Sequence, residues 1–384
     1  MQQGYHPDGT TGADTTRLFD LSKRNWGKTG LAGFTAAIAA GSSKRNGDGG
    51  NETVRADDLS GFSIMYLVDN TDKELYNDDT KAHVGQLLAN CAPELTSAWG
   101  EGGLVNSRTG KYLPGFRDID DKEVQFRYVA DLSYAVADNA DATGTIAAGL
   151  AEFARQRSQD SIAYYDSDAD KLGGIHNAYN QGAEAVGVLT GLADQKSSNN
   201  AEENSKGANA AVNIFSDIAL TGLSAWSGPA AVAVNSTAGQ MIKPAVTTLA
   251  KPVIADAVSN ATGSEAVEVP TENSERSLWA ASVQDAANAG LLDERDFDAD
   301  NSNTYTWIKE NEDGSHSIDL SNTHGAKNRE VTDWVNSVQS PDAKRDPNAP
   351  KRPRDPTLDK LNDDFKGVRA DGRTRGVTEG KNRK

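Results

Sequence analysis

Two runs of alternating aspartates are the residues whose spacing comes closest to that of a metal site. They read DSDAD at residues 166–170 and DFDAD at residues 296–300, and carboxylates at alternate positions open the calcium-binding loop of an EF-hand. That loop also needs glycine at its sixth position and glutamate at its twelfth. The first run has lysine and asparagine there, and the second has asparagine and tryptophan. We therefore interpret both runs as solvated acidic loops and assign no metal site.

Histidine, cysteine and serine residues form no catalytic or zinc-binding pattern in the sequence. The five histidines are scattered and the single cysteine, Cys91, lacks the spacing of a zinc site. The motifs G-x-S-x-G and G-x-x-x-x-G-K-[ST] are absent. His324, Asn328 and Arg329 resemble part of a nuclease-like cluster, but a polar loop explains the same residues. We assign no catalytic or cofactor-binding residue, and expect no cofactor and no enzymatic activity.

Charge is unevenly distributed along the chain. Its 384 residues carry a formal net charge of −17, yet the segment from Lys344 to Lys384 holds 13 basic and 7 acidic residues. The acidic body argues against nucleic-acid binding, because its field repels polyanions. The basic tail has the charge to bind acidic surfaces, including this body. Its DPNAPKRP stretch resembles the opening of an HMG box, but the aromatic-rich helix of that module does not follow.

The N-terminal residues and the cysteine content bear on localisation. MQQGYHPDGTTGADTTRLF lacks a basic region followed by an apolar one, so it is not a Sec signal peptide. A single cysteine excludes an intramolecular disulfide and leaves the compartment open. We expect a cytoplasmic protein or one exported by a non-Sec route.

A stretch without any charged residue lies between Asp217 and Lys243. A membrane-spanning helix needs about 20 predominantly apolar residues, whereas polar residues are spread through this stretch. Pro229 disfavours helix at the residue before it, so the run divides into two short helices. We predict that residues 218–242 pack within the protein and that there is no transmembrane helix. Insertion into lipid after a conformational change is the alternative.

Hydrophobic periodicity predicts a mainly α-helical protein. Asp57 or Asp58 is the expected N-cap of the first strong helix, and Asp78 or Asp79 that of the second. Two β-leaning runs flank NEDG at residues 311–314, which predicts a hairpin. The expected helices cover residues 59–70, 78–95, 118–140, 146–162, 172–194, 212–226, 274–294 and 329–340.

These elements predict a helical bundle, a small C-terminal module that contains a β-hairpin, and a disordered basic tail. The tail has many prolines and charges and one aromatic residue, a composition that cannot bury enough surface to fold. The predicted regions are a polar, glycine-rich lead with short helices (1–57), the bundle including the uncharged segment (58–257), a linker (258–273), a small α+β module (274–340) and the tail (341–384).

Three segments together carry a family resemblance. FDLSKRNWGKTGLAGFTAAIAAGSS, LSGFSIMYLVDN and TKAHVGQLLANCAPEL resemble the C-terminal region of large actinobacterial proteins described as TPR-repeat or WXG100-associated. That family has no known function and is linked to type VII secretion. Its Arg-x-Trp, here Arg24 to Trp26, precedes a short Ala/Gly-rich helix, and the resemblance extends over residues 14–257. The N-terminal WXG hairpin is missing, which implies a truncated or split member.

The resemblance implies a non-enzymatic interaction or structural protein associated with type VII secretion, with a protein partner that the sequence does not identify. YAVAD, from Tyr134 to Asp138, matches the Y-x-x-x-[DE] export pattern. Two alternatives stay open. One is an exported antibacterial effector that acts through the uncharged segment or the C-terminal module. The other is a phage or mobile-element structural protein, which the Gly/Ala/Asn-rich composition suggests.

Overall fold

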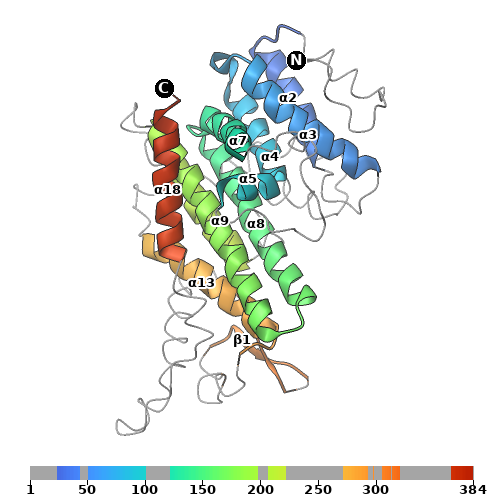
Figure 1. Ribbon diagram of the computed structural model, residues 1–384, viewed down its shortest axis with the longest axis vertical. Helices are drawn as coiled ribbons and strands as arrows, with labels where there is room; N and C mark the ends of the chain where they lie inside the picture. Colours follow the sequence, from blue (N-terminus) through green and yellow to red (C-terminus); the bar gives the residue numbers. More distant parts are fainter. Residues whose placement is uncertain are drawn as a thin grey trace.

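The structure, a computed structural model, consists mainly of α-helices, several of which run along the long axis of the molecule (Figure 1). It describes residues 24–43, 51–100, 122–197, 206–221, 271–292, 297, 305–312, 314–320 and 365–383. The helices are α2 (Lys28–Ser42), α3 (Asn51–Asn70), α4 (Asp78–Asn90), α5 (Ala92–Trp99), α7 (Lys122–Val136), α8 (Ala140–Tyr164), α9 (Asp168–Ser197), α10 (Lys206–Thr221), α13 (Thr271–Asn288) and α18 (Phe365–Lys381), with a 3₁₀ turn η1 at Lys73–Leu75.

Two short strands complete the described elements. Strand β1 (Ile308–Glu310) pairs with β2 (His316–Ile318) in an antiparallel hairpin, in which Lys309 lies opposite Ser317. Gly314 has φ +81 in the connecting turn, a conformation that glycine adopts without strain. The prediction of a mainly α fold with a small β-hairpin is confirmed.

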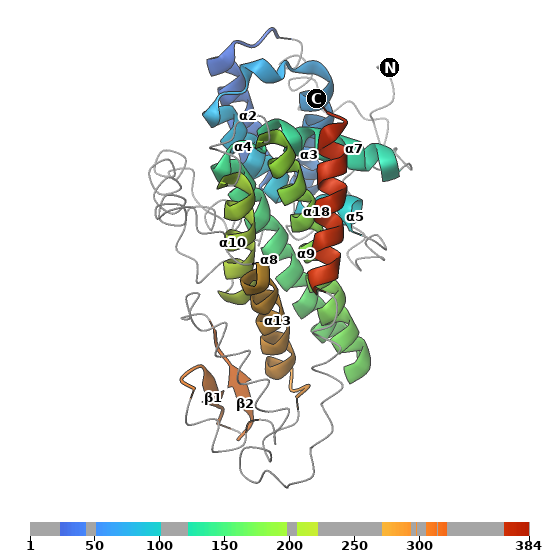
Figure 2. The same ribbon diagram turned by 90° about the vertical axis from the view of Figure 1, so that its left-hand side faces the viewer.

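Helix α9 lies at the centre of the bundle. Helix α8 precedes it and packs against it after a short turn at residues 165–167, and α10 packs against both. Figure 1 shows α18, α9 and α8 side by side, and Figure 2 shows α10 on another side of this group. Helix α4 packs against α8, and α2 packs against α4. Helix α13 contacts α9 and α10 and also contacts the hairpin. Most of the bundle is therefore organised around two long neighbouring helices.

Asparagine side chains begin two of the helices. Asn77 accepts a hydrogen bond from the Thr80 N–H at 2.9 Å, and Asn139 accepts one from the Ala142 N–H at 2.9 Å. Each satisfies a helical N–H that has no partner within the helix. The expected cap of α4, Asp78 or Asp79, is thus corrected to Asn77, and both aspartates lie in the first turn, where their charge suits the helix dipole.

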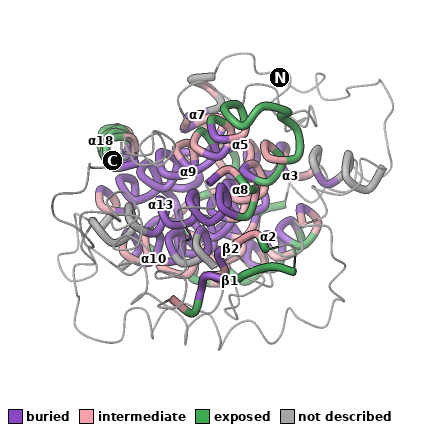
Figure 3. The backbone as a smooth tube through the Cα atoms, turned by 90° about the horizontal axis from the view of Figure 1, so that it is seen from below, coloured by how far each residue is buried: buried purple, intermediate pink, exposed green. Residues whose placement is uncertain are grey.

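One continuous hydrophobic core joins the described helices and the hairpin. It extends from Leu31 on α2 to Phe365 on α18 and includes Trp307 and Ile318 of the hairpin. Its largest fully buried side chains include Trp99, which ends α5. Figure 3 shows the buried residues of α8, α9 and α13 in the interior. The hairpin and α13 therefore share their core with the bundle.

Glycines allow α4 and α8 to approach closely. A Cβ atom on Gly85 of α4 would lie 2.6 Å from the Ala142 Cα, and one on Gly149 of α8 would lie 2.6 Å from the Ala89 carbonyl oxygen. Both distances are shorter than any van der Waals contact, so only glycine fits at either position. The two backbones consequently pack against each other directly, with alanines as their neighbours.

The structure corrects the prediction of disorder for part of the basic tail, residues 341–384. Residues 365–381 form helix α18, which packs along α9. Composition failed here because it reports how much apolar surface a segment has, whereas α18 is held by close backbone packing, as described below. The other residues of the tail lie outside the described part of the chain.

Two predicted boundaries also shift. Helix α3 begins at Asn51, inside the predicted lead, so Asp57 and Asp58 lie within the helix and not at its N-cap. Helix α13 begins at Thr271, inside the predicted linker. In both cases polar first turns hide the helix start from a search for apolar periodicity.

Of the uncharged segment 218–242, only residues 218–221 are described. They form the last turn of α10, where Ile218 and Ala219 are buried in the core. The rest of the segment and the predicted helix at 329–340 lie outside the described residues. Within the described ranges, no helix combines the length and the apolar character needed to span a membrane.

A substitution at Gly149 tests the close approach of α4 and α8. Gly149→Val should lower the free energy of unfolding by about 1–3 kcal/mol or more, because the new side chain meets the backbone of Ala89. The matched control is Gly33→Ala on α2, where an added Cβ meets nothing within 4 Å. This control should raise stability by up to about 1 kcal/mol through helix propensity. Urea unfolding followed by circular dichroism measures both, and equal stability of the two variants would contradict the packing.

Candidate functional site

Two glycines on α9 bring α18 into direct backbone contact. Gly187 and Gly191 lie about one turn apart on the same side of α9. A Cβ on Gly187 would lie 2.4 Å from the Arg369 carbonyl oxygen, and one on Gly191 would lie 2.2 Å from the Arg373 carbonyl oxygen. No side chain fits in either space. We call this surface, formed by Gly187 and Gly191 with the neighbouring Glu184 and Val188, the α9 face.

Helix α18 meets the α9 face with glycines of its own. Gly372, Gly376 and Gly380 recur every four residues. A Cβ on Gly372 would lie 2.4 Å from the Glu184 carbonyl oxygen, and one on Gly376 would lie 2.2 Å from the Val188 carbonyl oxygen. Contacts advance along both helices in the same direction, so the helices are parallel (Figure 1).

Ion pairs flank this glycine contact. Arg373 binds the Asp194 carboxylate through Nε and Nη2, each 2.7 Å from Oδ2. Burial raises the pKa of Asp194, and the Arg373 guanidinium opposes that rise. Arg383, just beyond the end of α18, pairs with Asp131 of α7. The basic tail helix is thus seated among carboxylates of the acidic body.

A third arginine, Arg375, reaches across to α5 and α7. Its Nη1 donates to the Trp99 carbonyl oxygen at 2.9 Å, and its guanidinium lies 4.3 Å from the centre of the Phe126 ring. The same Nη1 lies 3.8 Å from Glu184 Oε1. These three groups, a carbonyl oxygen, an aromatic ring and a carboxylate, all interact favourably with the planar guanidinium of arginine. Arg375 therefore fixes the position of α18 along the bundle.

A second polar cluster lies where α8, α9 and α13 meet. Asp285 of α13 is 7% exposed, and its Oδ2 accepts hydrogen bonds from the Ser158 hydroxyl at 2.6 Å and the Tyr179 hydroxyl at 2.8 Å. Burial raises the pKa of Asp285, while these hydrogen bonds and nearby Arg155 act in the opposite direction. Burial and the Asp285 charge raise the pKa of Tyr179 well above its usual range.

This cluster has the chemistry of a latch between helices. The Ser158 hydroxyl bonds directly to a carboxylate with no imidazole between them, so it lacks the base that activates a serine nucleophile. Tyr179 keeps its proton and acts as a donor. Asp285 therefore ties α13 to α8 and α9 through two charge-assisted hydrogen bonds.

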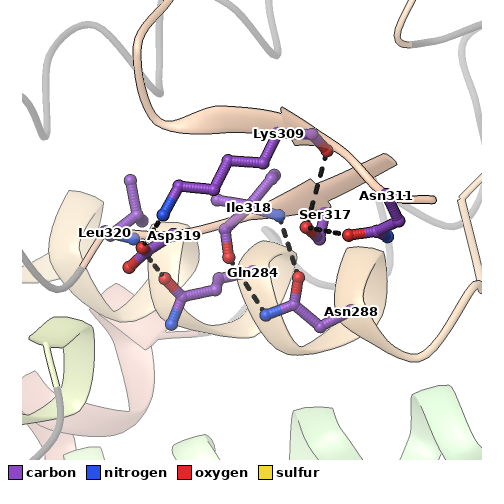
Figure 4. Close-up of polar contacts among 8 residues, drawn as sticks. All are labelled: Gln284, Asn288, Lys309, Asn311, Ser317, Ile318, Asp319 and Leu320. Atoms are coloured by element: carbon purple, nitrogen blue, oxygen red, sulfur yellow. Dashed lines mark hydrogen bonds and ion pairs between the residues drawn. The ribbon is translucent and has the colours of Figure 1, made fainter. Parts of the chain in front are cut away.

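Side-chain amides on α13 hold the hairpin, as Figure 4 shows. Asn288 accepts from the Ile318 N–H at 2.8 Å and donates to the Ile318 carbonyl oxygen at 3.0 Å. Gln284 accepts from the Leu320 N–H at 2.9 Å. Together the two amides bond to the outer edge of β2 and to the chain just beyond it, as a neighbouring strand would. Part of an edge that would otherwise be exposed is thereby paired.

The first aspartate run, 166–170, lies at the start of α9. Asp168 and Asp170 are in its first turn, and the Ser167 hydroxyl donates to Asp170 Oδ2 at 2.6 Å. The Lys171 Nζ lies 3.8 Å from Asp168 Oδ1. Across the described residues, no three histidine, cysteine, aspartate or glutamate side chains come together in a way that could hold a metal ion. Apart from Phe297, the second run lies outside those residues.

The structure places the other residues that the sequence singled out as follows. Cys91 is buried between α4 and α5. Tyr134 of YAVAD is 8% exposed, with the Lys196 ammonium 4.7 Å from its ring centre, and Asp138 pairs with Lys81 at 2.7 Å. Most of the Tyr134 side chain is therefore inaccessible to a partner in this structure. The residues His324, Asn328 and Arg329 lie outside the described part of the chain.

Sequence reasoning missed the α9 face and the Asp285 cluster. The first carries a detectable signal, since glycines at four-residue spacing occur in both GVLTG (187–191) and GRTRGVTEG (372–380). The second carries none, because Asp285 is 127 residues from Ser158 and 106 from Tyr179.

The fold and the α9 face define a helical-bundle protein that holds a basic, glycine-rich helix against an acidic body. The chain belongs to DUF6571, a family of unknown function whose profile matches residues 4–365. The matched residues end at Phe365, the first residue of α18. Comparisons with curated proteins and with solved structures gave no match.

The pH dependence of stability tests the burial of Asp285. Burial raises the pKa of folded Asp285 above its ordinary value of 3.8, so the folded state favours the protonated carboxyl, and the hydrogen bonds to the ionised carboxylate offset only part of this preference. The stabilisation from the protonated form is fully present below pH 3.8 and is lost as the pH rises through the folded pKa. The unfolding free energy of the wild type relative to Asp285→Asn should therefore increase as the pH falls, by about 1.4 kcal/mol per pH unit within that window. Urea unfolding at a series of pH values measures this difference, and a difference independent of pH would contradict the assignment.

Proposed function

We propose that this protein is a non-enzymatic interaction protein whose α9 face binds basic, glycine-rich helical segments. One observation carries the proposal: α18 is seated on α9 by reciprocal glycine-to-backbone contacts, with Arg373 paired to Asp194 beside them. Such a contact needs a helix of a defined kind, because any larger side chain at Gly372 or Gly376 meets backbone.

The sequence of α18 indicates that this helix forms because α9 binds it. Four glycines, at 367, 372, 376 and 380, lie among its 17 residues, and each costs about 1 kcal/mol relative to alanine in a helix. An isolated helix of this length is marginal even with good helix formers. Docking on α9 offsets these costs, so folding and binding of α18 are coupled.

Charge adds specificity to the contact. Asp194, Glu184 and Asp131 surround the α18 seat, and each lies within 4 Å of an arginine in or just beyond α18. Complementary charge selects a basic partner and disfavours an acidic one. The function of the α9 face is therefore to recognise small residues at four-residue spacing together with flanking arginines.

A peptide-binding experiment on the full chain tests this function. The variant Gly376→Ile should lose the docking of its own α18, because the new side chain meets the Val188 backbone, while the α9 face keeps its sequence. A labelled peptide of residues 362–384 should then bind this variant, as measured by fluorescence anisotropy. The same peptide with Gly376→Ile should bind about tenfold more weakly or worse, a loss of at least about 1.4 kcal/mol.

Three controls make the result specific. The wild-type chain and the chain with Gly367→Ala, where an added Cβ meets nothing within 4 Å, should not bind the peptide, because their own α18 occupies the face at high effective concentration. A chain with both Gly376→Ile and Gly191→Ile should also fail to bind. Equal binding of the two peptides, or no binding of the wild-type peptide to the Gly376→Ile chain, would refute the proposal.

We further propose that the protein is an actinobacterial one linked to type VII secretion, a link that rests on the sequence resemblance of residues 14–257. The protein should occur in the supernatant or envelope of the producing bacterium, and it should stay in the cytosol when type VII secretion is disabled. Fractionation with an antibody against the helical body measures this. Cytosolic protein in both strains would remove the link to export and leave the proposal for the α9 face unaffected.

A further inference from the structure

A small pocket opens beside the Asp285 latch, between α8 and α13. It has a volume of about 290 Å³, and its lining includes Arg155 and Gln159 from α8 and Asp285 and Ala289 from α13. Pockets for small molecules begin at about this size. The pocket shares no residue with the α9 face, so it is a separate feature of the molecule.

Arg155 has donors to spare in this pocket. Its Nε is buried and has no hydrogen-bond partner among the described residues. Its Nη1 makes one long contact of 3.4 Å with Glu152. A guanidinium carries five N–H donors, and a buried donor without a partner is unfavourable. The Arg155 side chain is 18% exposed, so a ligand with an acceptor oxygen would meet the accessible part of the guanidinium and not the buried Nε.

Asp285 offers the opposite charge from the other wall. Both of its hydrogen bonds, from Ser158 and Tyr179, go to Oδ2, which leaves Oδ1 as an acceptor. Asp285 and Arg155 line the same pocket, yet no ion pair between them occurs among those of the described residues. The pocket thus has one cationic and one anionic wall, which interact electrostatically without forming an ion pair.

We propose that this pocket binds a small zwitterion, of the class to which free α-amino acids belong. The ligand carboxylate lies against Arg155, whose planar fork suits carboxylate oxygens, and the ligand ammonium lies against Asp285. A simple anion is repelled by Asp285 and a simple cation by Arg155, so only a molecule with both charges satisfies both walls. The Gln159 amide provides a further polar contact for the ligand side chain. Ligand size is limited by the volume to that of a single amino acid.

Thermal-shift and calorimetric titrations of the full chain test this proposal. The twenty standard L-amino acids are added singly at millimolar concentration, and at least one should raise the melting temperature and bind in calorimetry. The N-acetyl and the C-terminal amide derivatives of the best binder each lack one charge, and each should bind at least tenfold more weakly. Failure of all twenty to bind, or equal binding of the derivatives, would overturn the proposal.

Two variants locate the binding site. Arg155→Met removes the carboxylate partner, and Ala289→Leu fills the pocket without changing the Asp285 latch. Each should weaken binding at least tenfold. The matched control Ala37→Leu, at an exposed position of α2, should bind as the wild type does. Wild-type affinity in either pocket variant would show that the amino acid binds elsewhere and would overturn the proposal, and circular dichroism confirms that each variant is folded.

Discussion

The distance between helix backbones is the constraint on which this structure depends. Gly85 and Gly149 set it between α4 and α8, and Gly187 and Gly191 set it between α9 and α18. Where backbones touch, dispersion contacts are dense but the buried side chains are small. Apolar burial alone therefore gives such helix pairs little preference for one register over another, and the glycine positions supply it, since each glycine fits against one backbone segment of its neighbour.

Buried polar groups provide the remaining specificity. Asp285 is bonded to α8 through Ser158 and to α9 through Tyr179, and the buried Gln284 amide accepts from the Leu320 N–H just beyond β2. Each of these groups would be unfavourable in the interior without its partners, so an arrangement that separates them is penalised. They lie in and around the region where α13 meets the rest of the bundle. Close packing at the glycines therefore positions the long helices, and hydrogen bonds position α13 and the hairpin.

Sequence periodicity predicted the long helices well, because their apolar positions are frequent and regularly spaced. The helix expected at residues 172–194 is found as Asp168–Ser197, and the NEDG turn lies between two strands as expected. Helix starts were less predictable, since Asn77 and Asp78 are both good caps and only the backbone decides between them. The tail helix was missed because a count of apolar residues does not register packing through glycine. The Asp285 cluster could not be foreseen, since its three residues meet only after the chain has folded.

The parallel arrangement of α9 and α18 gives the basic residues near their ends an additional role. Two parallel helices align their macrodipoles, which places two partial negative charges together at one end of the pair. Lys196 lies in the last turn of α9, Lys381 lies in the last turn of α18, and Arg383 lies two residues beyond it. Cations at this end offset the repulsion between the aligned dipoles. Positive charge in the tail thus stabilises the parallel orientation itself, in addition to its attraction to the acidic body.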